Sequence, residues 1–308
     1  MNKLSLAAVA LALSAGSAFA GDLPSTKAAP VAPVVASPWD YDIGAGLTSD
    51  YIFRGVTQSN HQPSVSAHGE LRYNWTDAYQ LYIGASSESI KFSNSVYPVG
   101  SPAVEIDGDA GIRGTHGAFA FDLGAIVYGY PDSPTGTKTI APWGTAGLSP
   151  RNPTFVEVYF KPTYNVNDSL TIGANVFYSP SYLNTGADDE YLSGTIKYTL
   201  PGSLSAFAVS GEFGHQWLGK VDTIYTTPFT YIGNANGQLP DYNYWNAGLS
   251  YTWKFVTLDL RYYGTDLSRK AAYQLTGIPN NYSGTTSNYA DDRFVATLSF
   301  DLTSKDLK

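Results

Sequence analysis

The sequence has 308 residues and a net charge of −8, with 26 Asp and Glu against 18 Lys and Arg. This acidic balance gives no support for nucleic acid as a partner. It contains no cysteine, which excludes a disulfide framework, a thiolate metal site and a lipid-anchored N-terminus. Its 24 Tyr, 14 Phe and 30 Gly favour half-exposed β-sheet surfaces over a helical core.

Residues 1–20 predict a secretory signal peptide. Lys3 is followed by an apolar run from Leu4 to Leu13 and then by small residues that end at Ala20, which is the order of such a leader. The alternative is a membrane anchor, but the apolar run is too short to span a bilayer as a helix. We expect cleavage after Ala20, which removes one positive charge.

Residues 21–37 are rich in Pro and Ala and have no periodicity, so we expect a disordered periplasmic tether. Residues 38–302 are expected to form one domain, and 303–308 a short C-terminal tail. No apolar run is long enough for a membrane helix. A chain of this kind can cross a membrane only as a closed sheet, because only closure satisfies every backbone N–H and C=O in hydrocarbon.

The domain contains about twelve segments of about 10–14 residues in which apolar and polar side chains alternate. This length and this period are typical of membrane-spanning strands. In the first segment Tyr41, Ile43 and Leu47 share one face. The clearest later segments are Ser64–Trp75, Val104–Arg113, Leu192–Leu200, Trp245–Trp253, Val256–Tyr262 and Arg293–Asp301. In none of them does a charged residue fall on the apolar face. A lipid-facing Arg or Lys at the bilayer midplane costs about 2–4 kcal/mol, so this absence favours a lipid-facing surface.

Short and long connections alternate along the chain. The short ones are Thr76-Asp77, His116-Gly117, Asn165–Asp168, Pro201–Ser203 and Lys254-Phe255. The long ones are Val56–Gln62, Ser93–Pro102, Pro131–Asn152, Pro180–Asp188, Trp217–Pro240 and Thr265–Ala290. A soluble β-sandwich would share the composition, but its Greek-key crossovers break such an order. The pattern predicts an all-β protein, a transmembrane up-and-down antiparallel β-barrel of about 12 strands with long extracellular loops.

The positions of four tryptophans fit the aromatic girdles that such a barrel has at the two membrane surfaces. Trp245 and Trp253 share one face eight residues apart, which is roughly 26 Å along a strand. We therefore expect them to mark two aromatic girdles. Trp39 and Trp75, like Trp253, lie beside short-turn ends, as expected of a periplasmic girdle. The alternative is that these are ordinary core aromatics.

Several segments of the chain match motifs of a known family. The signature-like stretch is Ser49-Asp50-Tyr51-Ile52-Phe53-Arg54-Gly55-Val56-Thr57-Gln58-Ser59. Further matches are Phe121–Tyr128 with Tyr130-Pro131, Phe155–Tyr159, Tyr178–Pro180, Tyr244–Leu267 and Ala290–Phe300. Together these segments resemble the TorF family of proteobacterial outer-membrane proteins. The resemblance implies a β-barrel, an outer-membrane location in a Gram-negative bacterium and an assumed channel role. It implies no catalytic residues.

The predicted inner face carries charges of both signs. The inward acids are Asp42, Asp50, Glu70, Glu88, Glu105, Asp107, Asp109, Asp122, Glu157, Glu212 and Asp259. The inward bases are Arg54, Arg72, Arg113, Lys161, Lys197, Arg261 and Arg293. These groups could form ion pairs that brace the wall. Alternatively, the excess of acids gives the lumen a negative potential that favours cations.

From these residues we take as lumen-lining or selectivity candidates Glu105, Asp107, Asp109, Asp50, Arg54, Glu70, Arg72, Arg113, Asp259, Arg261 and Arg293. Glu105, Asp107 and Asp109 form the densest carboxylate column and the best candidate for a selectivity element. Their spacing of roughly 6–7 Å along one strand argues against a metal site. Arg54 would fix the first long loop through a pair with Asp50 or another neighbour, or else contact a solute.

Catalysis has little support in the sequence. Among the four histidines only His68 lies close to a hydroxyl, that of Ser66, and on this register both side chains point into the lumen, without an orienting partner. No cofactor signature is present, so we predict no enzyme activity, no cofactor and no metal. We predict a porin for small hydrophilic solutes or ions, embedded in outer-membrane lipid. The alternative is a closed structural or surface-interaction barrel that acts through its long loops. The sequence does not decide the oligomeric state or the solute.

Overall fold

The structure is a computed structural model that describes residues 38–92, 102–131, 133, 137–140, 144–147, 151–225, 232–234, 236–280, 284–304 and 306. The signal peptide and tether expected for residues 1–37 lie outside these residues, and so do most of the second long connection and part of the third.

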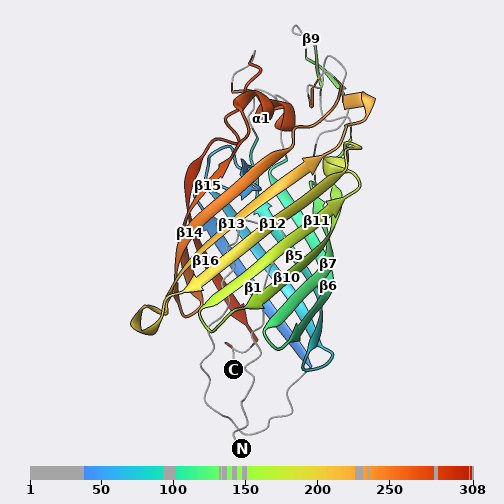
Figure 1. The fold of residues 1–308 in the computed structure, drawn as a ribbon. Coiled ribbons are helices and arrows are strands. Elements are labelled where there is room, and N and C mark those ends of the chain that lie inside the picture. Colours follow the sequence, from blue (N-terminus) through green and yellow to red (C-terminus); the bar gives the residue numbers. More distant parts are fainter. Residues whose placement is uncertain are drawn as a thin grey trace, which may run out of the picture.

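Twelve antiparallel strands form a closed barrel (Figure 1). In chain order they are β1 (Trp39–Thr48), β4 (Ser64–Asn74), β5 (Tyr79–Ser89), β6 (Val104–His116), β7 (Phe119–Gly129), β10 (Phe155–Asn165), β11 (Leu170–Ser179), β12 (Asp189–Thr199), β13 (Phe207–Leu218), β14 (Tyr242–Trp253), β15 (Val256–Thr265) and β16 (Arg293–Thr303). Each strand pairs with the strands before and after it in this order. The predicted up-and-down antiparallel barrel of about 12 strands is confirmed.

The barrel closes between its first and last strands. β1 pairs with β16 from Asp42 opposite Thr303 to Thr48 opposite Thr297, and on its other side with β4. Closure leaves the sheet without an edge, so the backbone groups of every barrel strand have neighbours on both sides.

The connections separate into two ends, which we call the short-turn end and the long-loop end. Each strand pair β4–β5, β6–β7, β10–β11, β12–β13 and β14–β15 is joined at the short-turn end, where β1 also begins and β16 ends. The long connections follow β1, β5, β7, β11, β13 and β15. The alternation predicted from the sequence is therefore the alternation of the barrel.

The long loops carry short elements of their own. They are the hairpins β2 (Ile52–Phe53) with β3 (Val56–Thr57) and β8 (Thr137–Ile140) with β9 (Gly144–Gly147), the 3₁₀ turns η1 (Tyr182–Asn184) and η3 (Thr223–Tyr225), and the helix α1 (Arg269–Thr276). A further 3₁₀ turn, η2 (Gly202–Leu204), lies at the short-turn end. The Ser268 side chain caps α1 by accepting from the N–H of Ala271, and Gly277 ends it at φ 68°. None of the helices described is long and apolar enough to cross a membrane.

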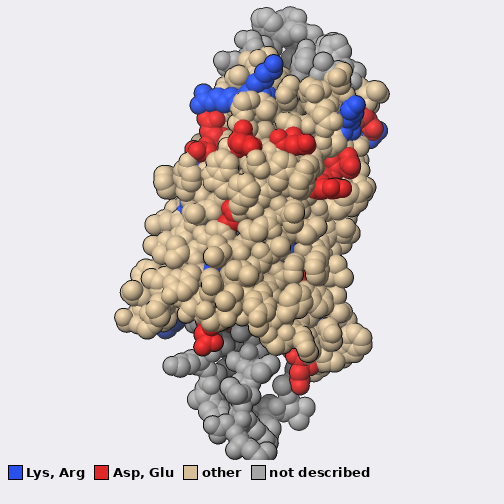
Figure 2. Space-filling model, in the orientation of Figure 1, with Lys and Arg blue, Asp and Glu red and all other residues tan. Residues whose placement is uncertain are grey.

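The outer face of the barrel is apolar around its middle. Many outward apolar side chains in mid-strand are exposed, such as Leu258 at 41% and Ile83 at 62%. Figure 2 shows a broad surface of uncharged atoms over the strands, with acidic and basic residues gathered toward the long-loop end. This is the surface of a barrel that meets hydrocarbon.

Three of the four predicted girdle tryptophans lie together at the short-turn end. Trp39, Trp75 and Trp253 are 54%, 63% and 58% exposed, and Trp39 packs against the ring of Tyr73 with centroids 4.9 Å apart. Trp245 is only partly exposed, nearer the long-loop end of β14. Their contact with a membrane surface stays a prediction.

A charge on the apolar outer face should destabilise the barrel in a way that depends on depth. Leu260 lies in the middle of β15, so Leu260→Arg is expected to cost about 2–4 kcal/mol of folding free energy. Phe294 also faces outward but lies at the long-loop end of β16. Phe294→Arg should therefore cost only about 0–1 kcal/mol of folding free energy. Equal costs, measured by denaturant titration in lipid vesicles, would contradict the assignment of this face to hydrocarbon.

Candidate functional site: the first loop inside the barrel

The first long loop folds into the barrel. Tyr51, Ile52 and Val56 are buried at 3%, 2% and 6% exposure within the aromatic cluster that occupies the long-loop end. β2 and β3 form a two-stranded hairpin there, separate from the barrel sheet. We call residues 49–63 the inner loop.

The turn of this hairpin consists of Arg54 and Gly55. Their φ angles are 45° and 83°, both positive, as a type I′ hairpin turn requires. Glycine adopts such an angle without strain, whereas arginine rarely does. A Cβ on Gly55 would also overlap the side chain of Thr265 on β15, so the turn needs both the conformational freedom and the small size of glycine.

Arg54 reaches across the barrel to the opposite wall. Counting strands around the barrel, β11 lies directly opposite β1, and Arg54 contacts the two strands that flank β11. Its Nη2 donates to Oε2 of Glu157 on β10 at 2.9 Å, and its Nη1 donates to Oδ2 of Asp189 on β12 at 2.9 Å. Both carboxylates are nearly inaccessible, at 0% and 1% exposure.

Aromatic rings complete the pocket around the guanidinium. The Arg54 Cζ atom lies 4.3 Å from the ring centroid of Tyr191 and 5.1 Å from that of Phe177, within cation–π range. The hydroxyl of Tyr128 donates to Glu157 at 3.0 Å, and that of Tyr242 lies 3.1 Å from the carbonyl oxygen of Arg54. The turn is therefore held through both its side chain and its backbone.

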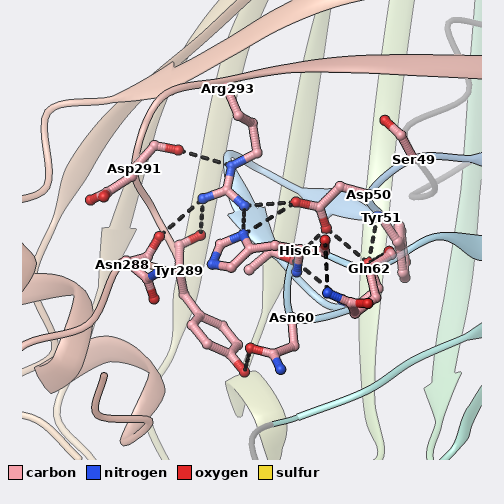
Figure 3. Close-up of polar contacts among 12 residues, drawn as sticks. Ser49, Asp50, Tyr51, Asn60, His61, Gln62, Asn288, Tyr289, Asp291 and Arg293 are labelled. Atoms are coloured by element: carbon pink, nitrogen blue, oxygen red, sulfur yellow. Dashed lines mark hydrogen bonds and ion pairs between the residues drawn. The ribbon is translucent and has the colours of Figure 1, made fainter. Parts of the chain in front are cut away.

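The base of the inner loop is anchored by Asp50 (Figure 3). Arg293 on β16 donates from Nη1 to Oδ2 of Asp50 at 2.7 Å. Thr57 and Ser59 donate their hydroxyls to Oδ1 of Asp50 at 2.5 and 2.8 Å. The Nδ1 atom of His61 lies 3.4 Å from Oδ2. One carboxylate thus connects the two sides of the loop to the last barrel strand.

Arg293 also binds the end of the last long loop. Its side chain donates to the carbonyl oxygens of Asp291, Asn288 and Tyr289, at 2.9, 3.0 and 3.3 Å. The backbone N–H of Thr57 donates to the carbonyl of Tyr289 at 2.9 Å. The first and last long loops are therefore joined next to Asp50.

The electrostatic balance at Asp50 favours its ionised form. Burial would raise the pKa of this carboxyl, but the hydrogen bonds from His61, Thr57, Arg293 and Ser59 outweigh burial and hold the pKa below its ordinary value of 3.8. The anchor is charged at neutral pH and carries the partners that a buried carboxylate needs.

Below the inner loop the wall residues form a polar network. Arg113 on β6 donates two hydrogen bonds of 2.7 Å to Glu70 on β4 and one of 3.1 Å to Asp122 on β7. Arg72 pairs with Asp42 at 3.1 Å and also with Glu70. These candidates brace neighbouring strands, as the ion-pair interpretation of the inner face expects.

A second group braces the opposite part of the wall. Arg261 on β15 donates to both oxygens of Asp259, at 3.0 and 2.9 Å. It also donates to Asn246 on β14 at 2.5 Å and to Ser210 on β13 at 2.7 Å. The guanidinium therefore connects three adjacent strands.

The carboxylate column is divided by the inner loop. Glu105 and Asp107 are each 2% exposed, and Glu105 accepts from the hydroxyl of Tyr51 at 2.5 Å. Asp109, farther from the loop, is partly exposed. All three point inward, but only Asp109 is open to the lumen in this structure. The selectivity role of the column stays a prediction.

Sequence reasoning placed Arg54 inside the barrel and offered Asp50 or another neighbour as its partner. The proposed pair with Asp50 is absent, because Asp50 is bound by Arg293 and the hairpin carries Arg54 to the far wall. Asp189 was not among the inward acids. The alternation around Leu192 would have found it, because Asp189 shares the inward parity of Tyr191 and Ser193.

The chain matches a protein family to which no activity is assigned. Residues 32–299 match the family described as "Bacterial protein of unknown function (Gcw_chp)", a description that does not carry the TorF name, so TorF stays a resemblance. No curated protein sequence matches significantly.

Solved structures similar to the chain include two porins and a bacterial channel. The NanC porin is 12% identical over 85% of this chain and 100% of its own, with a TM-score of 0.48. The KdgM porin is 10% identical over 85% and 98%, with a TM-score of 0.42. An outer membrane channel from Pseudomonas putida is 10% identical over 89% and 100%, with a TM-score of 0.46.

Removing the Arg54 side chain should release the inner loop. Arg54→Ala leaves Glu157 and Asp189 buried without their cation, a change that costs about 3–5 kcal/mol at such sites. Because the chain has no cysteine, a Val56→Cys background gives one thiol, buried at the hairpin. We expect this thiol to react much faster with a maleimide when Arg54→Ala is added.

The matched control is Arg151→Ala, which removes an ion pair to Asp222 whose partners are 43% and 45% exposed. Such pairs contribute about 0–1 kcal/mol, so thiol reactivity should not change. Equal reactivity in the two variants would show that Arg54 does not hold the hairpin.

Acid should weaken the anchor at Asp50. Because the folded pKa is below the ordinary value of 3.8, the ionised carboxylate stabilises the anchored loop above that pH, and this contribution disappears as the pH falls through the folded pKa. We expect the Val56→Cys thiol, probed with an acid-active disulfide reagent, to stay protected down to pH 3.8 and to become accessible as the pH falls further through the folded pKa. Asp50→Asn should lack this step and be more accessible at neutral pH. The same pH profile in both proteins would contradict the assignment.

Proposed function

We propose that this chain, which belongs to the Gcw_chp family of bacterial proteins of unknown function, is an outer-membrane porin for small hydrophilic solutes or ions. Its leader, cleaved after Ala20, would direct it to the outer membrane of a Gram-negative cell, with outer-membrane lipid around the barrel. The observation that carries the proposal is the charged inner face of a twelve-stranded barrel. A purely structural barrel could pack an apolar interior instead.

The size of the barrel supports passage along its axis. Barrels of about eight strands are filled by their own side chains, whereas those of 16 to 18 strands are open porins. Twelve strands lie between these limits. The ion pairs of Arg72, Arg113 and Arg261 run along the wall between nearby strands, so they do not by themselves bridge the lumen.

A mild preference for cations is the finer part of the proposal. Acids outnumber bases on the inner face, so the lumen potential is negative. The inner loop is the constriction, because its hairpin crosses from β1 to β10 and β12. We expect a small conductance that rises when the hairpin is released.

The second candidate is a closed barrel that acts through its long loops. The observation in its favour is the depth to which the inner loop is fixed, with Arg54 and Asp50 both bound to distant strands. On this proposal the aromatic cluster at the long-loop end is a permanent seal, and Arg54→Ala would destabilise the protein without opening a path.

Single-channel recording in planar bilayers under a KCl gradient separates the two. The porin proposal expects stepwise currents, a reversal potential that favours K⁺ and a larger conductance in Arg54→Ala. Silence of both folded proteins would favour the closed barrel. Neutralising Glu105, Asp107 and Asp109 together should reduce the K⁺ preference. Unchanged selectivity would remove this column from the proposal.

A further inference from the structure

Three carboxylates meet inside the barrel wall at the long-loop end. Glu88 on β5 lies directly opposite Glu105 on β6, and Asp107 is the next inward residue of β6. One oxygen from each of the three lies within 4.8 Å of the others, and each residue is 2% exposed. The neighbouring strand thus adds a ligand that the spacing along β6 alone does not reveal.

This arrangement is unfavourable for three ionised carboxylates on their own. Like charges directly opposite on neighbouring strands repel, and burial adds a large desolvation cost for each charge that is not compensated. Protonation or a bound cation relieves such a cluster.

Six other buried acids of the barrel are paired with arginine. Glu157 and Asp189 have Arg54, Asp42 has Arg72, Asp122 has Arg113, Asp50 has Arg293 and Asp259 has Arg261. In the parts of the chain that the structure describes, no Lys or Arg pairs with Glu105 or Asp107. Both differ in this respect from the six paired acids.

Asp107 is the residue that points to a missing ligand. Its Oδ2 accepts a long hydrogen bond of 3.4 Å from Ser86. The backbone N–H of Gly129 also interacts with the carboxylate, but Oδ1 is buried with no hydrogen-bond partner. Glu105 is better satisfied, because the hydroxyls of Tyr51 and Tyr130 both donate to it. A buried carboxylate oxygen without a donor is rare in proteins, and a metal ion supplies what it lacks.

We propose that Glu88, Glu105 and Asp107 bind a divalent cation, and that this cation is Ca²⁺. A set of oxygen ligands suits a hard cation. The three oxygens lie within 4.8 Å of one another, so one ion can contact all of them. Ca²⁺ takes about 6–8 oxygen ligands in a flexible geometry, whereas Mg²⁺ keeps several waters and is usually bound by one or two carboxylates, so three converging carboxylates favour Ca²⁺. Bidentate carboxylates and water would complete its coordination shell.

The site also bears on the inner loop, because Tyr51 belongs to that loop and binds Glu105. Bound Ca²⁺ would fix the carboxylate that Tyr51 contacts and so stabilise the loop in the barrel. Cation binding does not depend on whether the barrel conducts, so its test is independent of the porin proposal.

Terbium luminescence tests the site directly. Tb³⁺ replaces Ca²⁺ at oxygen sites and emits when a nearby tyrosine is excited, and Tyr51 and Tyr130 both touch Glu105. In the refolded full chain in detergent we expect tyrosine-sensitised Tb³⁺ emission that Ca²⁺ displaces at much lower concentration than Mg²⁺. The triple variant Glu88→Gln, Glu105→Gln, Asp107→Asn should lose this emission.

Asp109→Asn is the matched control, because Asp109 is the next inward acid of β6 but lies outside the cluster, so its emission should equal that of the unmodified chain. Ca²⁺ should also raise the thermal unfolding temperature of the unmodified chain and of Asp109→Asn, but not that of the triple variant. Emission that persists in the folded triple variant, or is absent from the folded unmodified chain, would overturn the site. Equal displacement by Mg²⁺ would overturn the assignment to Ca²⁺.

Discussion

Closure of the sheet between β1 and β16 is the constraint on which the rest of this structure depends. A barrel in hydrocarbon must pair every backbone donor and acceptor within itself, and the register from Asp42 opposite Thr303 completes that pairing. Because each strand is paired on both sides, closure also fixes which side chains of every strand face inward and which face outward. A slip of one residue in β6 or β15 would bring inward charges such as Asp109 or Arg261 to the apolar outer face, so the register keeps the middle of that face free of charge.

The same closure creates an interior that the wall alone does not fill. The chain places its own first loop there, and the loop brings a positive charge into a region of low dielectric. Two carboxylates and two aromatic rings receive that charge. A buried ion pair of this kind contributes less net stability than its geometry suggests, but it defines position strictly, because the Arg54 guanidinium is satisfied only where Glu157 and Asp189 converge.

The barrel could be predicted from the sequence because its causes are local. Alternation along β1 or β14 identifies the strand and both of its faces, and the lengths of the connections identify the ends. The inner loop could not be predicted in this way. The segment Tyr51–Thr57 is short and apolar in part, and its burial depends on partners 103 and 135 residues away. The carboxylate cluster could be predicted only in part for a similar reason. Glu105 and Asp107 share a strand, whereas Glu88 joins them only through the register of β5 with β6.

The sequence separation between Arg54 and its partners also has a consequence for the order in which parts of the barrel fold. The inner loop belongs to the first strand to be made, but its binding site consists of residues from β10, β11 and β12, and its base is held by Arg293 on the last strand. Contacts so remote in sequence form late, because a long chain segment must close before they exist. The hairpin therefore docks only onto a nearly complete barrel, and its burial marks the end of folding.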